Sequence, residues 1–316
     1  AGRWKTERAQ FQKGIMDTFS DPKVERIVCM TASQVGKTEI LNNICGYFTH
    51  HDPCPTLVLQ PSLEMARAWS VDRLAPMIAG TPAFRSLIGD PKMKDGDNTI
   101  LFKTFKNGAR ISIAGSNSPV SLASRPIRLL LMDEVDRYPE SAGSEGDPCT
   151  LALRRTQNFF NRKIAMFSTP TIKGESRIES AFEDSDQRYY NVKCHDCGEP
   201  QTLNWSQVRW EKDKPETAKY HCKVCDAEWS DVQRKQAIGK GEWVATQPFN
   251  GIAGFHLNGL YSPFSDLHEF ASLFLQSKNA GQSALRVFVN TVLAESWEDV
   301  EGDEIQTHEI MVRART

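Results

Sequence analysis

Two stretches of the sequence carry side chains whose types and spacing suit phosphate chemistry. The first, TASQVGKTE (31–39), ends in the Gly-Lys-Thr triplet of the phosphate-binding pattern GxxxxGK[ST]. In that pattern backbone N–H groups surround the phosphates, the lysine neutralises them and the hydroxyl binds magnesium. Thr31 replaces the first glycine, and we expect it to need a backbone angle that glycine adopts more easily. On its own, the loop favours phosphate binding only slightly over a lysine and threonine that begin a helix.

The second stretch, LLLMDEVD (129–136), is an apolar strand that ends in two acids. A nucleotide hydrolase needs one carboxylate to orient magnesium and another to polarise the attacking water, so we assign Asp133 to the metal and Glu134 to the water. Taken alone, Asp133 and Glu134 would be interpreted as two solvated acids at the end of a strand. Because they follow a candidate phosphate loop, a catalytic role is the better interpretation. A third strand end, FSTP, offers Ser168 and Thr169 as sensors of the γ-phosphate, although Ser-Thr-Pro also simply ends strands.

A separate set of residues suits a metal. CHDC (194–197) and CKVC (222–225) are two CxxC pairs at roughly the separation of a zinc ribbon. We therefore predict a structural zinc bound by Cys194, Cys197, Cys222 and Cys225. His195 and His221 flank the pairs as competing ligands, and four free buried cysteines are the alternative.

The segment between the cysteine pairs carries aromatic and basic side chains. We consider two roles for Trp205, Arg209, Trp210 and Lys212: contact with DNA or a partner, or, more commonly, packing of a small domain whose core is thin.

The elements around these residues predict an α/β fold. Apolar strand-like runs at 26–30, 56–61, 128–134 and 163–170 alternate with helix-like runs, which is typical of a mainly parallel sheet with helices on both faces. Asn107-Gly108 between two alternating runs predicts a hairpin. Near the C-terminal end the pattern predicts two helices broken near 279–281, with Ser265 and Asp266 as caps for the first.

Bulk properties narrow the class of protein. The 316 residues are 40% hydrophobic and 25% charged, which suits a globular chain, and the net charge of -2 excludes a uniformly basic surface. Any DNA contact must therefore come from a local patch or from assembled subunits. No apolar run approaches the roughly 20 residues that span a membrane, and the first residues lack a signal core, so we expect an intracellular protein with no membrane partner.

The ordered set of motifs resembles the large subunit of phage lambda-type terminases, the GpA family, which package viral DNA into a procapsid. The stretches that carry the resemblance are FQKGIMDTFSD, TASQVGKTE, LVLQPSLEMARAWSVDRLAPMI, GSNSPVSLASRPIRLLLMDEVDRYP, STPTIKGESRIESAF and GFHLNGLYSP. A loop without the first glycine is ordinary in that family. The resemblance implies an additional-strand (ASCE) P-loop ATPase fold with a zinc-ribbon insertion, followed by a nuclease domain. Because the chain stops at RART, we expect that nuclease, and with it nicking, to be missing and to occur only in a full-length protein.

The expected organisation and site follow from this resemblance. We expect an ATPase core at 1–190, a zinc ribbon at 191–230, the C-terminal part of the ATPase domain at 231–300 and a linker at 301–316. The residues expected to bind ATP and magnesium are Gln12, Ser33, Gln34, Val35, Gly36, Lys37, Thr38 and Asp133. Gln12 would recognise adenine through its amide; the alternative is a surface glutamine without a role. The catalytic residues are Lys37, Glu134 and an arginine finger, for which Arg125 is preferred over Arg128 and Arg137.

The resulting function is an ATPase motor that uses ATP, Mg²⁺ and structural Zn²⁺ to move double-stranded viral DNA into a procapsid. The implied partners are the terminase small subunit, the portal and further copies of the chain in a ring, in the cytoplasm of a bacterial host that carries the phage or prophage. Two alternatives stay open: a helicase-like ATPase that remodels DNA without a capsid, and a zinc-dependent DNA-binding module whose loop does not hydrolyse ATP.

Overall fold

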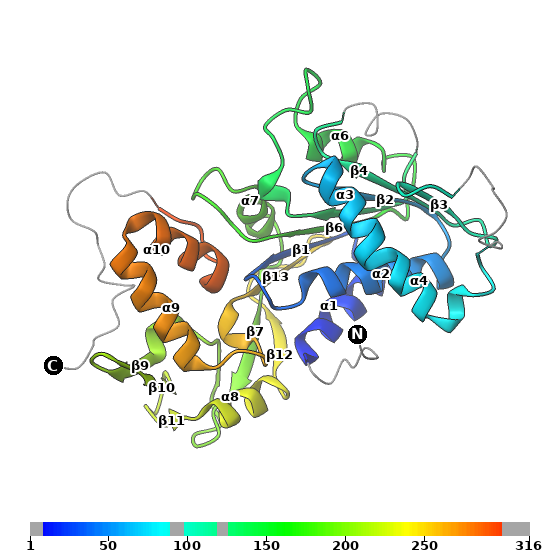
Figure 1. Ribbon diagram of the computed structural model, residues 1–316. Helices are drawn as coiled ribbons and strands as arrows, with labels where there is room; N and C mark the ends of the chain where they lie inside the picture. The colour runs from blue at the N-terminus through cyan, green and yellow to red at the C-terminus, as the bar shows by residue number, and fades with distance from the viewer. Residues whose placement is uncertain (1–8, 89–97, 119–125, 299–316) are drawn as a thin grey trace. The chain divides into compact units, whose positions relative to one another are not determined.

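The computed structural model describes residues 9–88, 98–118 and 126–298. The chain divides into two compact units (Figure 1). The first unit comprises Ala1–Asp17, Cys29–Gly36 and Thr169–Thr316, and the second comprises Thr18–Val28 and Lys37–Ser168. The boundary between the units passes through the strand β1 (Arg26–Thr31) and between Gly36 and Lys37, so the candidate phosphate loop contributes residues to both.

The second unit is built on a mainly parallel sheet. Its strand order is β1, β6 (Lys163–Ser168), β5 (Leu129–Asp133), β2 (Pro55–Gln60), β4 (Arg110–Gly115) and β3 (Phe102–Thr104). The strand β2 runs parallel to β4 and β5, and β5 runs parallel to β6, whereas β3 pairs with β4 as an antiparallel hairpin. Every residue of β5 and β6 is buried, as their continuous apolar sequences require for central strands.

Helices of the second unit follow the strands they connect. The helix α2 (Lys37–His51) begins directly after Gly36. The helix α3 (Leu63–Trp69), capped by the Ser62 hydroxyl, continues through a π-helical turn, η2 (Ser70–Leu74), into α4 (Ala75–Gly80), and this run lies beside α2 (Figure 1). The helix α6 (Pro148–Arg154) packs against β5. Trp69 Nε1 donates to Asn42 Oδ1 at 3.0 Å, which joins α3 to α2.

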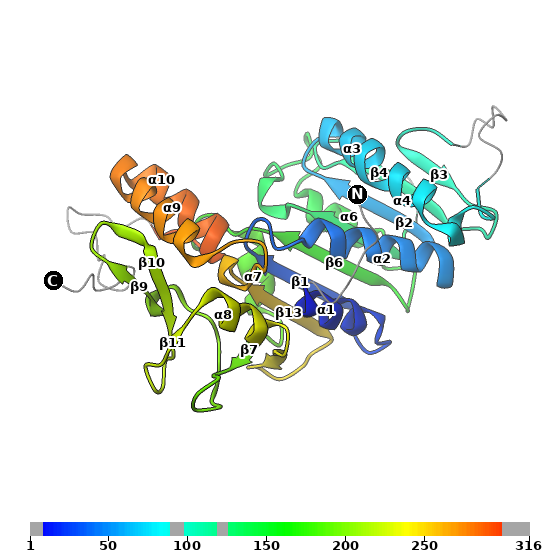
Figure 2. The ribbon, with the colours of Figure 1, turned by 60° about the horizontal axis from the view of Figure 1, so that its bottom comes forward.

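The first unit contains two sheets. One has the order β12 (Glu242–Ala245), β7 (Arg188–Lys193), β13 (Ile252–Leu257) and the end of β1, with β8 (Pro200–Gln201) paired to β7. The other is an antiparallel sheet of β9 (Val208–Glu211), β10 (Lys214–His221) and β11 (Glu228–Trp229). Figure 2 shows β9 and β10 beneath α9 (Leu267–Ala280), against which β10 packs.

The remaining helices of the first unit cover these sheets. Most of α1 (Gln10–Ser20), together with α7 (Arg177–Glu183), α8 (Asp231–Ile238), α9, α10 (Gln282–Phe288) and the π-helical turn η7 (Val289–Leu293), belongs to it. Gly281, at a φ of 100°, separates α9 from α10, as the sequence predicted. Asp266 precedes α9, and its N–H donates to Glu269 Oε2 at 2.8 Å in a capping box.

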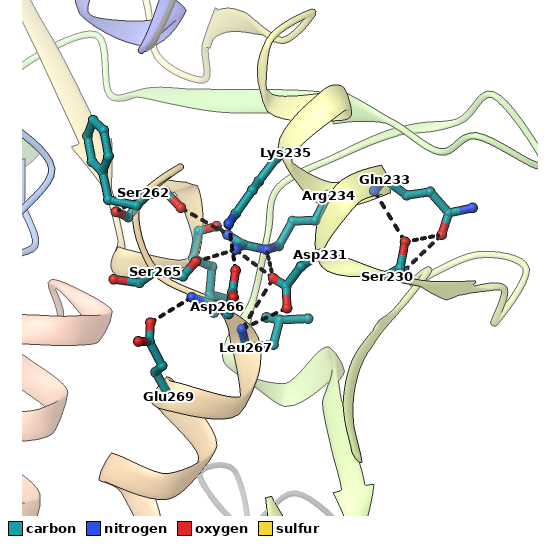
Figure 3. Close-up of polar contacts among 12 residues, drawn as sticks. Ser230, Asp231, Gln233, Arg234, Lys235, Ser262, Ser265, Asp266, Leu267 and Glu269 are labelled. Atoms are coloured by element: carbon teal, nitrogen blue, oxygen red, sulfur yellow. Dashed lines mark hydrogen bonds and ion pairs between the residues drawn. The ribbon is translucent and has the colours of Figure 1, made fainter. Parts of the chain in front are cut away.

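A buried arginine fixes the segment that precedes α9. Arg234, on α8, is fully buried, and its guanidinium pairs with Asp231 and donates to three backbone carbonyls (Figure 3). Those carbonyls belong to Leu260, Ser262 and Ser265. Asp231 in turn accepts from the Leu267 N–H at the start of α9. Residues 260–267 are therefore held by hydrogen bonds that are buried or partly buried.

The predicted strands at 26–30, 56–61, 128–134 and 163–170 and the hairpin around Asn107 are confirmed, as is a mixed α/β fold with a mainly parallel sheet. Among the described residues, no helix combines the length and apolar character that a membrane span requires.

Candidate functional site

The first half of the phosphate loop belongs to the first unit and is held by other residues of that unit. Thr31 is the last residue of β1 and is extended, so the expectation that it needs a glycine-like backbone angle is wrong. The left-handed residues of the loop are Gln34, at a φ of 63°, and Gly36, at 85°. The Ala32 N–H donates to the Leu257 carbonyl at 2.8 Å. The loop therefore starts from a strand that a neighbouring strand fixes, and threonine suits that position.

Ser33 is also anchored. Its N–H and its hydroxyl both donate to the Thr291 carbonyl in η7, at 2.8 and 3.0 Å. A phosphate contact by the Ser33 N–H therefore requires that this hydrogen bond opens. The π-helical turn that supplies the carbonyl is a rare conformation that occurs often at functional sites.

Gln12 lies in the interior of the first unit and not on its surface. It is 2% exposed, and its Nε2 donates to the Val35 carbonyl at 2.9 Å, whereas its Oε1 is buried without a hydrogen-bond partner. A Cβ on Gly36 would lie 2.2 Å from Gln12 Nε2, so the glutamine and the loop need glycine there. The free Oε1 is the acceptor that an amino group of a base would satisfy.

The second unit brings the catalytic candidates together. Lys37 Nζ, at the start of α2, lies 2.7 Å from Glu134 Oε1 at the end of β5. Thr38 is the next residue of α2. The Lys37–Glu134 contact is an ion pair without hydrogen-bond geometry, and Lys37 Nζ, Asp133 Oδ1 and Glu134 Oε2 are all buried with no hydrogen-bond partner. Buried polar atoms are normally satisfied, so these three atoms indicate a site for a polar ligand.

Backbone strain marks the same place. Glu134 has a φ of 54°, in the left-handed region that side chains other than glycine seldom adopt. Such strain costs about 1–3 kcal/mol and concentrates at functional sites. At Glu134 the bend turns the chain out of β5 immediately after Asp133.

The environment of Asp133 suits a cation. The residue is 6% exposed, and burial, followed by the neighbouring charge of Glu134, raises the pKa of Asp133 to about 6. Gln60, at the end of the adjacent strand β2, donates from Nε2 to Asp133 Oδ2 at 3.4 Å. Gln60 was not among the residues predicted from the sequence, although a polar residue that ends an apolar strand was a usable signal. The donor set fits a magnesium ion, because Mg²⁺ prefers oxygen ligands such as carboxylates and hydroxyls.

Ser168 lies beside the acidic pair. It ends β6, whose residue Phe167 pairs with Asp133, and its Oγ accepts from the Asp136 N–H at 3.3 Å. Thr169, which follows, is 6% exposed.

The arginine candidates differ in position. Arg125 lies outside the described residues. Arg128 precedes β5, at the end opposite Asp133, and binds both carboxylate oxygens of Asp52, with Nη1 at 2.7 Å from Oδ1. Arg137 lies close to Glu134: its Nε is 3.7 Å from Glu134 Oε2.

The four predicted cysteine ligands converge in the first unit. All four sulfur atoms lie within 4.8 Å of one another, and the Cys194–Cys225 and Cys197–Cys222 sulfur pairs are each 3.8 Å apart. Zinc at about 2.3 Å from each of four tetrahedral thiolates gives a sulfur separation of about 3.8 Å. The donor set and its geometry thus fit zinc.

The two cysteine loops share one backbone geometry. In each, the N–H two residues after the first cysteine points at its sulfur, from Asp196 to Cys194 and from Val224 to Cys222, both at 3.4 Å. Gly198 and Asp226, at φ values of 74° and 60°, close the loops by donating to the Cys194 and Cys222 carbonyls. Backbone donors that converge on sulfur stabilise thiolates.

The two histidines that were competing metal ligands, and the aromatic residues between the cysteine pairs, contact other side chains of the protein. His195 contacts Gln233, and His221 lies 3.7 Å from Asp226. Trp205 is 5% exposed and packs against Phe274, so packing accounts for it and DNA contact does not. Other members of that set are the partly buried Trp210, which also packs on Phe274, and Arg209, which pairs with Asp226.

Comparison with known proteins assigns the class. Residues 1–243 match the family described as "Phage terminase large subunit gpA, ATPase domain", and residues 252–316 match "Terminase large subunit gpA, endonuclease domain". The chain belongs to the phage terminase large subunit gpA family. The expectation that the nuclease is missing is wrong, because the second match includes β13, α9 and α10 and runs to the last residue.

Individual relatives agree with this class. The chain is 27% identical to the terminase large subunit of Enterobacteria phage P21, covering 98% of this chain and 52% of that one. It is 25% identical to that of Escherichia phage lambda, covering 94% and 50%. The chain therefore spans about half the length of these relatives. The ATPase domain of the Thermus phage P74-26 large terminase is a structural match at 14% identity and a TM-score of 0.48, covering 89% of this chain and 92% of that one.

Proposed function

We propose that this chain is the ATP-hydrolysing motor region of a phage terminase and that it drives double-stranded viral DNA into a procapsid. The observation that supports it most is the cluster of Lys37, Asp133 and Glu134 in the second unit, where three buried polar atoms have no hydrogen-bond partner. A buried lysine between two carboxylates, at the start of a helix, offers charges of both signs to a nucleotide and its metal.

Each residue has a role in the proposed reaction. Lys37 neutralises the terminal phosphates, the Thr38 hydroxyl and Asp133 hold magnesium, and Glu134 polarises the attacking water. Bound magnesium would supply positive charge to the phosphates. Because Lys37 and Glu134 are paired at 2.7 Å, nucleotide binding must separate them, which frees the carboxylate to accept a proton from water. We assign phosphate contacts to the loop residues Ser33, Gln34, Val35 and Gly36, and adenine recognition to Gln12.

The remaining assignments concern charge and coupling. Arg125 stays our candidate for the finger that reaches a neighbouring subunit, and the bidentate pair of Arg128 with Asp52 argues against Arg128. Ser168 and Thr169 are proposed to report loss of the γ-phosphate, because Ser168 Oγ accepts from Asp136 two residues after Glu134.

We further propose that residues 191–230 form a zinc ribbon inserted between 1–190 and 231–300. The sulfur spacing of 3.8 Å supports zinc at the four cysteines. The metal would be structural, because four protein ligands leave no open position for a substrate. The small subunit, the portal and further copies of the chain are the proposed partners. Since the curated relatives are phage proteins, we place the activity in the bacterial host cytoplasm.

The function is tested by ATP hydrolysis at increasing protein concentration, with wild type, Glu134→Ala and Arg125→Ala. We expect turnover to rise faster than linearly, to be lost in each variant and to return when the variants are mixed, since a mixed assembly contains sites with both residues intact. Linear turnover that is unaffected in Arg125→Ala would remove the finger assignment. No hydrolysis with DNA and portal present would contradict the motor.

A further inference from the structure

Asn258 joins two segments of the first unit that belong to the two proposed ligand sites. It follows β13 directly and is 6% exposed. Its Nδ2 donates to the Leu203 carbonyl at 2.7 Å, and its Oδ1 accepts from the Leu260 N–H at 3.1 Å. The Leu203 N–H donates to the Tyr261 hydroxyl at 2.7 Å. Both backbone groups of Leu203 are thus held by residues 258–261.

Leu203 belongs to a short strap, residues 200–205, that leads back to the cysteine cluster. Gln201, in the strap, is 5% exposed and donates from Nε2 to Cys222 Sγ at 3.1 Å. Its Oε1 accepts from the Lys223 N–H at 2.9 Å. The Gln201 amide therefore makes two hydrogen bonds to the second cysteine loop, one to Cys222 and one to Lys223. Zinc bound by the four cysteines would fix the position of Cys222 Sγ and, through this hydrogen bond, the position of the Gln201 amide.

The other side of Asn258 leads to the phosphate loop. The carbonyl of Leu257, the preceding residue, accepts from the Ala32 N–H at 2.8 Å. Adjacent residues at the end of β13 therefore bind the strap and the loop. The connection is short: it consists of the bond from Ala32 to Leu257, the peptide to Asn258, the bond to Leu203, and the strap to Gln201 and Cys222.

The loop depends on such support. It lacks the first glycine, and its start is set by the bond from Ala32 to Leu257. A loop whose backbone is already restrained at its start loses less freedom on binding than a mobile one. Restraint at the end of β13 therefore favours ATP binding at residues that Asn258 itself does not touch. The buried bonds of Arg234 to residues 260–265 limit how far this segment can relax by itself.

We propose that Asn258 is a positioning residue through which the zinc ribbon orders the ATP loop, so that zinc and ATP stabilise each other's binding. This inference rests on the proposed ATP and zinc sites. Coupling between two ligands is reciprocal: if zinc strengthens ATP binding by some factor, ATP must strengthen zinc binding by the same factor. Coupling of this kind is typically about 5–150-fold, and we expect the lower end, about tenfold, because one short connection carries it.

The chain offers a matched control on the same strand. Asn250 precedes β13 as Asn258 follows it, its Nδ2 donates to the Asp184 carbonyl at 2.7 Å, and its Oδ1 accepts from the Ile252 N–H at 3.1 Å. Asn250 thus repeats the bonding pattern of Asn258 at the opposite end of β13, away from Ala32, although Asn250 is exposed, so it controls for the loss of these bonds and not for the loss of a buried side chain. Asn258→Asp sharpens the test further, because it keeps the size of the side chain and the acceptor for Leu260, whereas it replaces the donor to Leu203 by an oxygen that repels the Leu203 carbonyl.

The experiment measures two quantities on the zinc-loaded chain: the affinity for Mg·ATP, and the rate of zinc release to a chromogenic chelator with and without Mg·ATP. In wild type and Asn250→Ala, we expect ATP to slow zinc release about tenfold and zinc removal to weaken ATP binding about tenfold. In Asn258→Asp and Asn258→Ala, ATP should bind about tenfold more weakly while zinc is still present, and it should no longer slow zinc release. Removal of zinc from these variants should then have little further effect on ATP affinity.

The outcomes separate this inference from the proposed function. Equal slowing of zinc release by ATP in wild type and the Asn258 variants overturns the route through Asn258. If wild type binds both ligands but ATP does not change zinc release, the coupling is absent and only this inference fails. Wild type that binds no ATP, or holds no zinc, overturns the corresponding proposed site and this inference with it. A thermal melt of each variant shows whether it folds, and an unfolded Asn258→Ala leaves the isosteric Asn258→Asp to decide.

Discussion

The cluster of Lys37, Asp133 and Glu134 and the cluster of four cysteines both bring together side chains that can hold a ligand, but they differ in how much of their bonding capacity is used. At Lys37, Asp133 and Glu134, buried atoms are left without hydrogen-bond partners, and Glu134 holds a strained backbone. At the cysteines, backbone N–H groups and Gln201 already point at the sulfurs, and sulfur separations match a closed tetrahedral shell. A site with unused capacity is built to exchange ligands, whereas a saturated one is built to keep its ligand.

Removal of the lysine should have the largest effect. Lys37→Ala deletes the positive charge of the catalytic cluster and leaves Glu134, which is mostly buried, without its partner at 2.7 Å. We expect hydrolysis to fall by about 10²–10³-fold, because charge stabilisation of this kind is worth several kcal/mol. Steady-state ATPase assays measure the loss. Lys163→Ala serves as a comparison: this buried lysine bonds the Asp21 and Val24 carbonyls, so its loss should lower stability more than turnover per folded molecule.

Loss of zinc should act on stability first. Cys222→Ser removes one proposed ligand together with the acceptor of Gln201, and we expect the first unit to lose its metal and melt at least about 10 °C lower, since binding energy of structural zinc is folding energy. Metal analysis and calorimetry measure both changes. Cys149→Ser changes a buried cysteine outside the cluster and should keep full zinc content. Equal zinc content in both variants would contradict the four-cysteine site.

Replacement of the loop glycine should have an intermediate effect. Gly36→Ala combines a φ of 85° with a Cβ position 2.2 Å from Gln12 Nε2, so it must displace either the loop or the glutamine. We expect ATP affinity to fall about 10- to 100-fold, from strain of about 1–3 kcal/mol. Gly174→Ala has a similar φ of 80° but open space around the new methyl group, so it should cost stability without changing ATP affinity. Isothermal titration calorimetry with Mg·ATP compares the ATP affinities of Gly36→Ala and Gly174→Ala. Equal affinities would show that the close approach of Gly36 to Gln12 does not affect ATP binding.

The smallest effect is expected at Arg128. The Arg128 side chain holds the pKa of Asp52 below its usual value, mainly through their hydrogen bond. A lowered carboxyl pKa stabilises the fold above the unfolded pKa, and that contribution is lost as the pH falls through and below about 4. Because Asp52 is 47% exposed, we expect Arg128→Lys to lower the free energy of unfolding by no more than about 1 kcal/mol at pH 7. Denaturant unfolding at pH 7 and pH 3 checks that the difference becomes smaller in acid.

Arg128→Lys also sharpens the finger assignment. It should change ATP turnover less than twofold, because Arg128 precedes β5 at the end opposite Asp133, whereas Arg125→Ala should remove turnover. The reverse ranking would make Arg128 the functional arginine and would require its pair with Asp52 to open.

Local sequence patterns were sufficient to predict those parts of the candidate sites in which the residues are close together in the sequence. The Gly-Lys-Thr triplet, the acidic end of β5 and the spacing of the CxxC pairs each describe one turn or one strand end, and the structure brings the cysteines together as predicted. The parallel sheet followed from apolar runs alone. Glu134 and Lys37 meet because each follows a strand of the same sheet.

Long-range contacts were not predictable in the same way. The bond from Ser33 to Thr291 spans 258 residues, and that from Gln201 to Cys222 depends on the fold of the strap. Thr31 was expected to be strained because the predicted strand ended at residue 30, whereas β1 continues through Thr31 in an extended backbone that suits threonine. Trp205 carried no signal that separated packing from DNA contact until its neighbour Phe274 was known.

The most direct measurement of the central claim is Mg·ATP binding and hydrolysis by Glu134→Gln beside wild type. The amide keeps the size of the carboxylate but cannot accept the proton of the attacking water, and it removes the partner of Lys37. We predict that hydrolysis falls at least about 100-fold while ATP affinity is unchanged or higher. Hydrolysis that persists near the wild-type rate would contradict the assignment of Glu134 and, with it, the catalytic cluster.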